Sequence, residues 1–335
     1  MSFGRKHGRA VLLLGGIATV AALVWQVGPA ELWNVLALSW PIVPAVVVLD
    51  LAWFSVEGIA LLLFYGPGRK NIPMRVWVHA LTTHYSTMVI LPVGRVGAEA
   101  VRATLLAPYV GAHKTAAGAA QMQVMVLVAN AVMCIPAFFA AASLGGWKGS
   151  LAVLVIVNFF ANGLLGVAMA LFLRKVRIGG WLGKKFESMV QWGPELDAEL
   201  RQQPAVPVVP GLLCVGGRAL QALEYGLVLA TVAGTSLTFT GTFIAEGIHI
   251  GAAALGDMVP NQVGVAEGMY RVFADSLGLA AHPEKALAIA LVVRVANFLA
   301  AGLCFGMVAL LGGRTSQEAE PPASVSALAQ PDPER

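Results

Sequence analysis

The sequence predicts an all-α polytopic membrane protein with six spanning helices and two re-entrant helical hairpins, arranged as an inverted repeat. Of its 335 residues, 58% are hydrophobic and only 12% are charged, whereas an average soluble domain has about 25% charged residues. A soluble protein this apolar would lack the polar surface needed to cover its core, but lipid can face Leu and Val directly. The charged residues also cluster between long uncharged runs, which is typical of membrane spans joined by polar loops.

Six runs are long enough to cross a bilayer, which takes about 20 mostly apolar residues in a helix. These runs are Ala10–Val27, Pro41–Phe64, Ala116–Leu144, Leu151–Leu173, Val208–Val232 and Ala286–Leu311. Basic residues precede the first run, as they do in a signal peptide. No convincing cleavage site occurs before Trp33, so we expect this run to remain as a span.

Two further stretches, Arg75–Tyr109 and Phe239–Leu279, are less regular. Each holds an apolar run, a Pro/Gly break that carries charge, and a second helical run. Basic loops stay in the cytoplasm, and the basic clusters of this chain all fall on one side if each stretch enters and leaves by the same face. Both termini are then cytoplasmic, and the two hairpins enter from opposite faces. Eight full crossings, with each stretch as one tilted span, is the alternative.

The chain is expected to form a single transmembrane domain over residues 1–312, with inverted halves at 10–173 and 205–312. Between them, segment 175–201 mixes Trp, Leu and Phe with charged residues. This composition predicts an amphipathic helix on the cytoplasmic surface, with a solvated loop as the alternative. Residues 313–335 are rich in Glu, Pro, Ser and Ala, which predicts a disordered cytoplasmic tail.

Two short patterns recur at nearly the same interval, which is close to half the length of the chain. The segment that runs from Pro92 to Glu99 resembles the segment that runs from Pro260 to Glu267. In the preceding helices, the segments that begin at Glu57 and Glu224 resemble each other at almost the same separation. With the opposite hairpin orientations, the shared interval predicts an inverted repeat of the kind found in many transporters. A duplicated bundle with only structural symmetry is the alternative.

Charged side chains inside membrane spans cost at least about 2.5–3.5 kcal/mol each, so they persist where they are paired, hydrated or functional. The charged residues of the predicted spans and hairpins are Asp50, Glu57, Arg95, Glu99, Arg102, Arg218, Glu224, Glu246, Asp257, Glu267, Arg271 and Arg294. Helical spacing places Glu99 beside Arg102, and Glu267 beside Arg271, on one helix face. Local ion pairs are the simplest explanation of these four residues.

A more specific interpretation starts from the breaks at Pro92 and Pro260. The helix after each break would begin near the membrane centre, where its free N–H groups and positive dipole end favour an anion such as a lipid phosphate. Arg95, Arg102 and Arg271 would add contacts to that phosphate. Unsatisfied backbone at that depth also requires a polar cavity. The candidate substrate-binding residues are Arg95, Glu99, Arg102, Glu267, Arg271, Glu57 and Glu224.

Beyond this site, the further chemistry that the sequence offers is a proton relay through His249 and Glu246. The sequence has no P-loop, nucleotide fingerprint, metal-ligand spacing or recognisable nucleophile motif. Its three cysteines lie singly in apolar runs, which is typical of packing residues. We therefore expect no catalytic residues, no metal and no cofactor. The mild net charge of +4 does not indicate a nucleic-acid partner.

The motifs around the two breaks resemble those of the flippase-like lysylphosphatidylglycerol synthase transmembrane family. That family has a P-x-x-x-G-E-x-x-R-like motif in its first half and a P-G-G-x-G-x-x-E-like motif in its second. Here Pro92, Gly97, Glu99 and Arg102 fill the first motif, with Ala98 inserted between Gly and Glu.

The second motif is filled less completely. Pro260, Gly264 and Glu267 match it, but Asn261 and Gln262 replace the two consecutive glycines. Because glycine adopts conformations that other residues avoid, this departure is expected to change the backbone geometry of the second hairpin.

The resemblance covers roughly residues 10–312 and implies a bacterial inner-membrane protein that translocates or handles a lipid. The size and the lone transmembrane unit also resemble the hopanoid-biosynthesis-associated branch of the family, so a hopanoid or an anionic or aminoacylated phospholipid is the expected partner. The alternatives are a non-catalytic membrane subunit that works with lipid-biosynthesis proteins, and a membrane-embedded enzyme that acts on a lipid headgroup.

Overall fold

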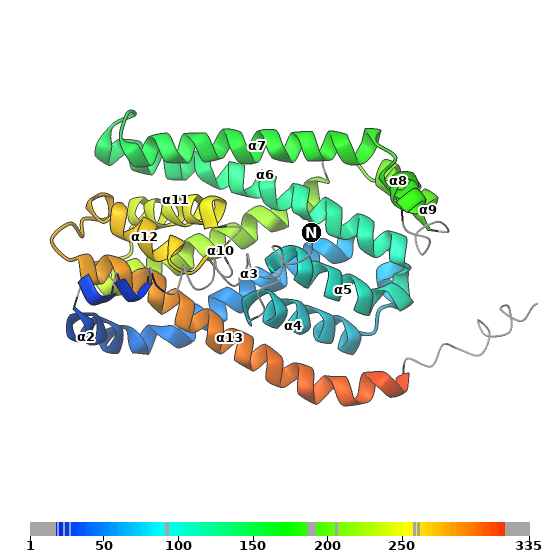
Figure 1. Cartoon of the computed structure of the whole chain (residues 1–335), viewed down its shortest axis with the longest axis horizontal. Coiled ribbons are helices and arrows are strands. Elements are labelled where there is room, and N and C mark those ends of the chain that lie inside the picture. The colour runs from blue at the N-terminus through cyan, green and yellow to red at the C-terminus, as the bar shows by residue number, and fades with distance from the viewer. Residues whose placement is uncertain are drawn as a thin grey trace, which may run out of the picture.

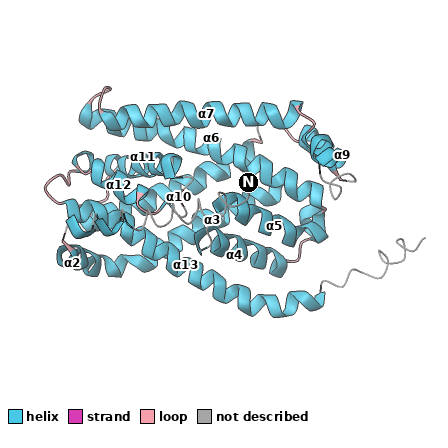
Figure 2. Cartoon of the chain, viewed as in Figure 1, coloured by secondary structure: helices cyan, strands magenta, loops and turns pink. Residues whose placement is uncertain are grey.

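The computed structural model describes residues 18, 20–22, 24–26, 28–90, 94–185, 192–204, 207–256, 259 and 262–318. This part of the chain consists of helices joined by turns and short loops, with no strand in it (Figure 2). Several of its helices are long and apolar enough to cross a membrane. The prediction of an all-α polytopic membrane protein is thereby confirmed.

The described helices follow one another along the chain with short connections. They are α2 (Pro29–Ser39), η1 (Trp40–Ile42), α3 (Val43–Phe64), η2 (Gly66–Asn71), α4 (Met74–Ile90), α5 (Gly94–Val110), α6 (Ala112–Gly145), α7 (Ser150–Lys175), α8 (Ile178–Lys185), α9 (Gly193–Gln202), α10 (Val208–Ala233), α11 (Phe239–Gly256), α12 (Val265–Val272), η5 (Asp275–Leu277) and α13 (Pro283–Glu318). Gly234 ends α10 in the left-handed conformation, which glycine adopts at little cost.

Within the described part of the chain, five helical segments are long and apolar enough to span a membrane. They are Pro29–Phe64, Ala112–Gly145, Ser150–Lys175, Val208–Ala233 and Pro283–Leu311. Each contains or overlaps one of the six predicted spans. Of the remaining prediction, Ala10–Val27, the structure describes only residues 18, 20–22 and 24–26, which are helical. The second predicted span is longer than expected, because α2 precedes it and joins it through the 3-10 turn that contains Pro41.

The two irregular stretches form pairs of shorter helices. The first pair is α4 and α5, which are 17 residues each and pack against one another. At about 1.5 Å per residue, each is slightly shorter than a bilayer core of about 30 Å. The second pair is α11, with 18 residues, and α12, with only eight. Both predicted break prolines, Pro92 and Pro260, lie outside the described residues.

In each half of the chain, one of the shorter helices packs on a long helix of the other half. Helix α4 packs on α13 of the second half, and α11 packs on α6 of the first half. Helices α3 and α10 pack on each other in the middle of the bundle. Figure 1 shows α6 and α13 on opposite sides of this centre, running in opposite directions along the long axis. Each hairpin therefore contacts the long helix that belongs to the other half.

Connections gather at the two ends of the bundle (Figure 1). One end holds the α3–α4 and α5–α6 turns together with α8 and α9. The other end holds the α6–α7, α10–α11 and α12–α13 connections. Most basic loop residues, including Arg69, Lys70, Arg174 and Lys175, belong to the first end.

The segment between the halves corrects one expectation. Instead of a single amphipathic helix over 175–201, the described residues of this range include two short helices, α8 and α9. The carboxylate of Asp197 joins them by accepting the backbone N–H groups of Gly179 at 2.7 Å and Gly180 at 3.0 Å. At the other terminus, α13 continues to Glu318, so the first residues of the expected tail are helical and the rest lies outside the described part.

Candidate functional site

A cavity of about 320 Å³ lies in the middle of the bundle, and nine of the described helices contribute to its wall: α3, α4, α5, α6, α7, α10, α11, α12 and α13. Both halves of the chain therefore line it. Its charged lining residues are Asp50, Arg95, Arg218, Glu224 and Arg294. Amide side chains from α6, α7, α10 and α13 add neutral donors and acceptors. The volume is near the lower end of ligand pockets, so it fits a lipid headgroup without its acyl chains.

Two arginines and one glutamate form a positive cluster on this wall. Arg95 Nη2 at the start of α5 lies 2.5 Å from Glu57 Oε2 on α3, and Arg218 Nη2 on α10 lies 3.7 Å from Glu57 Oε1. Arg218 also donates to Gln221 and lies 5.6 Å from the centre of the Trp53 ring. Glu57 is buried, and it balances only one of the two positive charges. The cluster therefore carries a surplus positive charge at the cavity, which suits an anion.

A carboxylate on the same helix as Glu57 is fully satisfied by neutral donors. Asp50 accepts from the hydroxyl of Tyr85 and from Trp53 Nε1, the latter at 2.7 Å. The Asn297 amide, oriented with its nitrogen toward Asp50, donates a third bond at 3.1 Å. Because these donors come from α3, α4 and α13, they fix the first hairpin against the long helix of the second half.

The predicted pair of Glu99 and Arg102 forms as the helical spacing indicated. The Arg102 guanidinium donates to both carboxylate oxygens of Glu99, with Nη2 at 2.6 Å from each. Both side chains are buried, and neither is among the residues that line the cavity. His84 Nδ1 lies 3.8 Å from Glu99 Oε2. This arrangement is typical of a structural ion pair. The carboxylate of Glu99 balances the charge of Arg102, so Arg102 is not a free cation for a phosphate.

The predicted pair of Glu267 and Arg271 is wrong. Glu267 is fully buried and accepts from Arg294 Nε at 2.7 Å and Nη2 at 2.6 Å, across from α12 to α13. Arg271 is exposed. Arg271 lies one turn later on the same face of α12, but only Glu267 is buried, where α12 packs on α13. Burial of Glu267 against α13 selects the arginine on that helix.

The start of α12 also differs from the expected anion site. Glu267 Oε2 accepts the backbone N–H of Gly264 at 2.8 Å, so the helix caps its own N-terminus in the manner of a capping box. A negative charge already sits where a lipid phosphate was expected. This end of the second hairpin is therefore not a free anion site in the structure.

Of the seven predicted site residues, the structure gathers some at the cavity and separates others. Arg95 and Glu224 line the cavity. Glu57 and Glu267 lie behind it, each bound to an arginine that lines the wall. The remaining three, Glu99, Arg102 and Arg271, are not among the lining residues.

The sequence interpretation left Arg218, Arg294 and Asp50 out of the site, although all three line the cavity. The signal that would have found them is the same one that flagged Glu57: a charged residue inside an apolar span. Spacing within one helix does not reveal the charged partners of Arg218 and Arg294, because Glu57 and Glu267 lie on other helices.

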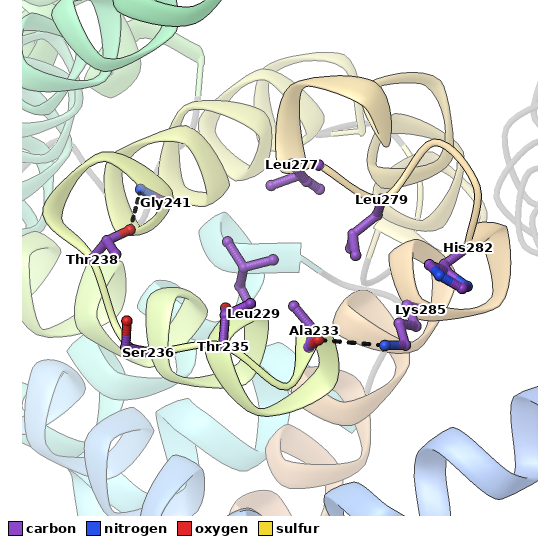
Figure 3. A pocket seen from close by; sticks show the side chains of 11 residues that line it. Leu229, Ala233, Thr235, Ser236, Thr238, Gly241, Leu277, Leu279, His282 and Lys285 are labelled. Carbon is purple, nitrogen blue, oxygen red and sulfur yellow. Dashed lines mark hydrogen bonds between the residues drawn. The ribbon is translucent and has the colours of Figure 1, made fainter.

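A second pocket, of about 450 Å³, lies at the bundle end that holds the α10–α11 turn and the start of α13 (Figure 3). Lys285 Nζ donates to the Ala233 carbonyl at 3.4 Å on one side of it, and Thr238 Oγ1 accepts from the Gly241 backbone on the other. Figure 3 shows Leu229, Leu277 and Leu279 between these sides. The buried charges described above do not line this pocket, so the central cavity is the stronger candidate site.

Among the described residues, no group of three or more His, Cys, Asp or Glu side chains is arranged to hold a metal ion. The three cysteines, Cys134, Cys214 and Cys304, are unpaired and buried. They occupy apolar surroundings on three different helices, as expected for packing residues.

Comparison with known proteins links the chain to a membrane family. The family model described as the lysylphosphatidylglycerol synthase TM region matches residues 10–305, which is most of the chain. No curated protein and no solved structure matches it.

Proposed function

The chain belongs to the lysylphosphatidylglycerol synthase transmembrane-region family, and we propose that it binds the headgroup of a membrane lipid in its central cavity and moves that lipid between the leaflets. The observation that carries the proposal is the positive cluster of Arg95, Arg218 and Glu57 on the wall of a cavity shared by both halves. The proposed role is transport without catalysis.

The chemistry of the cavity favours an anionic headgroup. Guanidinium groups bind phosphate oxygens through two parallel hydrogen bonds, and they hold their charge when buried. Arg95 is partly exposed, with 23% of its side-chain surface accessible, so a ligand can reach it. The amides around the wall supply bonds for glycerol or sugar hydroxyls. We propose an anionic phospholipid as the cargo. The experiment below distinguishes this cargo from a neutral hopanoid.

The arrangement of the helices supports a way to move the headgroup. The packing of α4 on α13 and of α11 on α6 supports the proposal that the two halves are related by inversion and that the helix pairs α4–α5 and α11–α12 are re-entrant hairpins. In transporters built from inverted repeats, rocking of one half against the other exposes a fixed site to each side in turn. The cavity lies between the halves here, as that mechanism requires.

The distribution of basic residues supports an orientation. The bundle end with α8 and α9 carries most of the basic loops, so we propose that it faces the cytoplasm of a bacterial inner membrane. Both termini then lie on the cytoplasmic side. Labelling of single cysteines introduced at Lys184 and Lys148 would measure this, with only the second accessible from outside the cell.

A transport assay tests the proposed function. Purified protein is reconstituted in liposomes of phosphatidylethanolamine and phosphatidylglycerol that contain fluorescent NBD-labelled phosphatidylglycerol, and dithionite reports the label in the outer leaflet. We expect Arg95→Gln to slow movement of the label by about 10- to 100-fold, because a hydrogen bond to a charged group is worth about 1.5–3 kcal/mol. Glu57 keeps its ion pair with Arg218 in this variant, so the fold should persist.

Arg271→Gln is the matched control, since it removes the same charge from an exposed position on α12. Its rate should equal that of the unaltered protein. Equal rates for Arg95→Gln and Arg271→Gln would refute the cavity as the route of the lipid. If Arg95→Gln slowed only the movement of a labelled lipid with an uncharged headgroup, the result would indicate a neutral cargo such as a hopanoid.

The alternative, a non-catalytic subunit of a lipid-synthesis complex, makes a different prediction. A subunit that acts only through its surface should support the lipid pathway in cells when Arg95→Gln is present. Loss of the pathway with that variant, and its retention with Arg271→Gln, would favour transport.

A further inference from the structure

We propose that Glu224 and Glu246, together with His249, form a proton-binding centre beside the central cavity, and that the protein moves its anionic lipid together with a proton. This inference rests on the proposed lipid transport, since it names the ion that accompanies the cargo. It assigns a task to three buried groups that the headgroup site does not use.

The three side chains are buried on two neighbouring helices and have unused hydrogen-bonding capacity. Glu224 on α10 is 1% exposed, and its Oε2 has no hydrogen-bond partner. Glu246 on α11 is fully buried, and neither of its carboxylate oxygens has one. His249, one turn further along α11, stacks on the Tyr225 ring at 4.4 Å and leaves its Nδ1 without a partner. Glu224 and His249 both line the cavity.

These glutamates differ from the other acidic groups buried in the described part of the bundle. Asp50 receives three hydrogen bonds, and Glu57, Glu99 and Glu267 each contact at least one arginine. Burial of an ionised carboxylate without such partners is very costly, so the group takes up a proton instead. Buried polar groups that remain unsatisfied in a native protein are rare and call for a reason. Reversible proton binding supplies that reason here.

The surroundings show how the proton and the lipid would influence one another. Glu246 and His249 both lie within the electrostatic reach of Arg218, and Glu224 lies within that of Asp50 and Glu246. Other titratable groups that face the centre are Tyr85 on α4, Cys134 on α6, Tyr225 on α10, Tyr270 on α12 and Arg294 on α13. Arg218 is thus the cation common to the headgroup cluster and the proton centre.

This shared arginine couples the two sites. An anionic headgroup at Arg95 and Arg218 offsets the positive field that Arg218 exerts on Glu246, so a bound headgroup favours proton binding. By reciprocity, a bound proton favours the headgroup to the same extent. The carboxylic acid forms when a proton from water on one side adds to the carboxylate, and it releases that proton to water on the other side. Proton and lipid therefore cross in the same direction.

Infrared spectroscopy tests the proton centre without requiring transport. A protonated carboxyl group has its own C=O stretching band, distinct from that of a carboxylate. We expect the unaltered protein to retain such a band at neutral pH, and we expect Glu246→Gln to remove part of it. Glu195→Gln is the matched control, because Glu195 lies on α9 with 60% of its side chain accessible, and its spectrum should not change. Identical spectra for all three proteins would overturn the inference.

A gradient experiment in the liposomes described above tests the coupling. With one proton per lipid, a difference of about one pH unit should drive about a tenfold asymmetry of the NBD-labelled phosphatidylglycerol, since one pH unit equals about 1.36 kcal/mol. Glu246→Gln should abolish this asymmetry, and Glu195→Gln should keep it. If the unaltered protein moved the labelled lipid but the pH gradient did not change its distribution, the coupling of lipid to proton would be wrong and the lipid transport would still hold. An absence of label movement would overturn the transport, and with it the coupling.

Discussion

Replacement of Arg294 by glutamine tests the rearranged ion pair of the second hairpin. In the structure, the fully buried Glu267 carboxylate accepts two bonds from Arg294, at 2.7 and 2.6 Å, and one from the Gly264 backbone at 2.8 Å. The variant keeps only the backbone bond. Removal of one partner from a buried ion pair costs about 3–5 kcal/mol. Because 14% of the Arg294 side chain is accessible to solvent, we expect the lower end of that range, about 3 kcal/mol.

Thermal unfolding of the purified protein in detergent measures this loss. In a domain of about 150–250 residues, 1 kcal/mol changes the midpoint by about 2–4 °C, so Arg294→Gln should lower it by about 6–12 °C. Arg271→Gln is the control, because it removes the same group from an exposed position on the same hairpin. A surface substitution of this kind stays within about 0.5 kcal/mol. Its midpoint should shift by at most about 2 °C.

The double variant Glu267→Gln, Arg294→Gln completes the test. It removes both charges and leaves no orphaned carboxylate, so it should recover part of the loss, with a coupling energy of about 1–3 kcal/mol. The opposite ranking, in which Arg271→Gln destabilises the protein more than Arg294→Gln, would refute the ion pair between Glu267 and Arg294. It would restore the pair that the spacing within α12 predicts.

Three smaller changes probe other parts of the bundle. Gln262 has a positive φ of 54°, which costs a non-glycine residue about 1–2 kcal/mol, so Gln262→Gly should raise the unfolding midpoint. Gly179→Ala should separate α8 from α9 and speed proteolysis between them, since its Cβ would overlap the backbone carbonyl of Gly193, whereas Gly180→Ala has room. Tyr85→Phe removes a bond to buried Asp50 and should destabilise the fold by about 1.5–3 kcal/mol.

Each of these three has an outcome that would contradict it. Gln262→Ala keeps the positive φ, so an equal gain from alanine and glycine would show that backbone strain is not the cause. Equal proteolysis of Gly179→Ala and Gly180→Ala would show that α8 and α9 do not approach closely. A Tyr85→Phe protein as stable as the unaltered one would show that Asp50 does not depend on the hydroxyl.

Long-range patterns in the sequence predicted the bundle well, because hydrophobic length determines which segments can span a bilayer. Five of the six predicted spans have a matching apolar helix. The two charged stretches were also correctly separated from the plain spans, since each is broken into two helices. These properties depend on composition over many residues and not on any single contact.

Partner choice inside the bundle could not be predicted in the same way. Helical spacing gave the correct partner for Glu99, whose arginine lies one turn away on the same helix. It gave the wrong partner for Glu267, because the arginine that binds it lies far along the chain on α13. The same limit applies to Glu57, which is held by arginines of α5 and α10. Tertiary packing decides such pairs, and one sequence carries no record of it.

The predicted internal repeat offers a reason for the different charges of the two halves of the cavity. The predicted repeat places Glu57 and Glu224 at corresponding positions, yet Glu57 contacts two arginines while one oxygen of Glu224 has no partner. When Glu99 is aligned with Glu267, the counterpart of Arg95 is Val263. When Glu57 is aligned with Glu224, the counterpart of Arg218 is Leu51. The substitutions that break the symmetry thus remove both cations from the second glutamate. In the proposed mechanism, Glu57 therefore helps to hold the anion site, and Glu224 belongs to the centre that binds the proton.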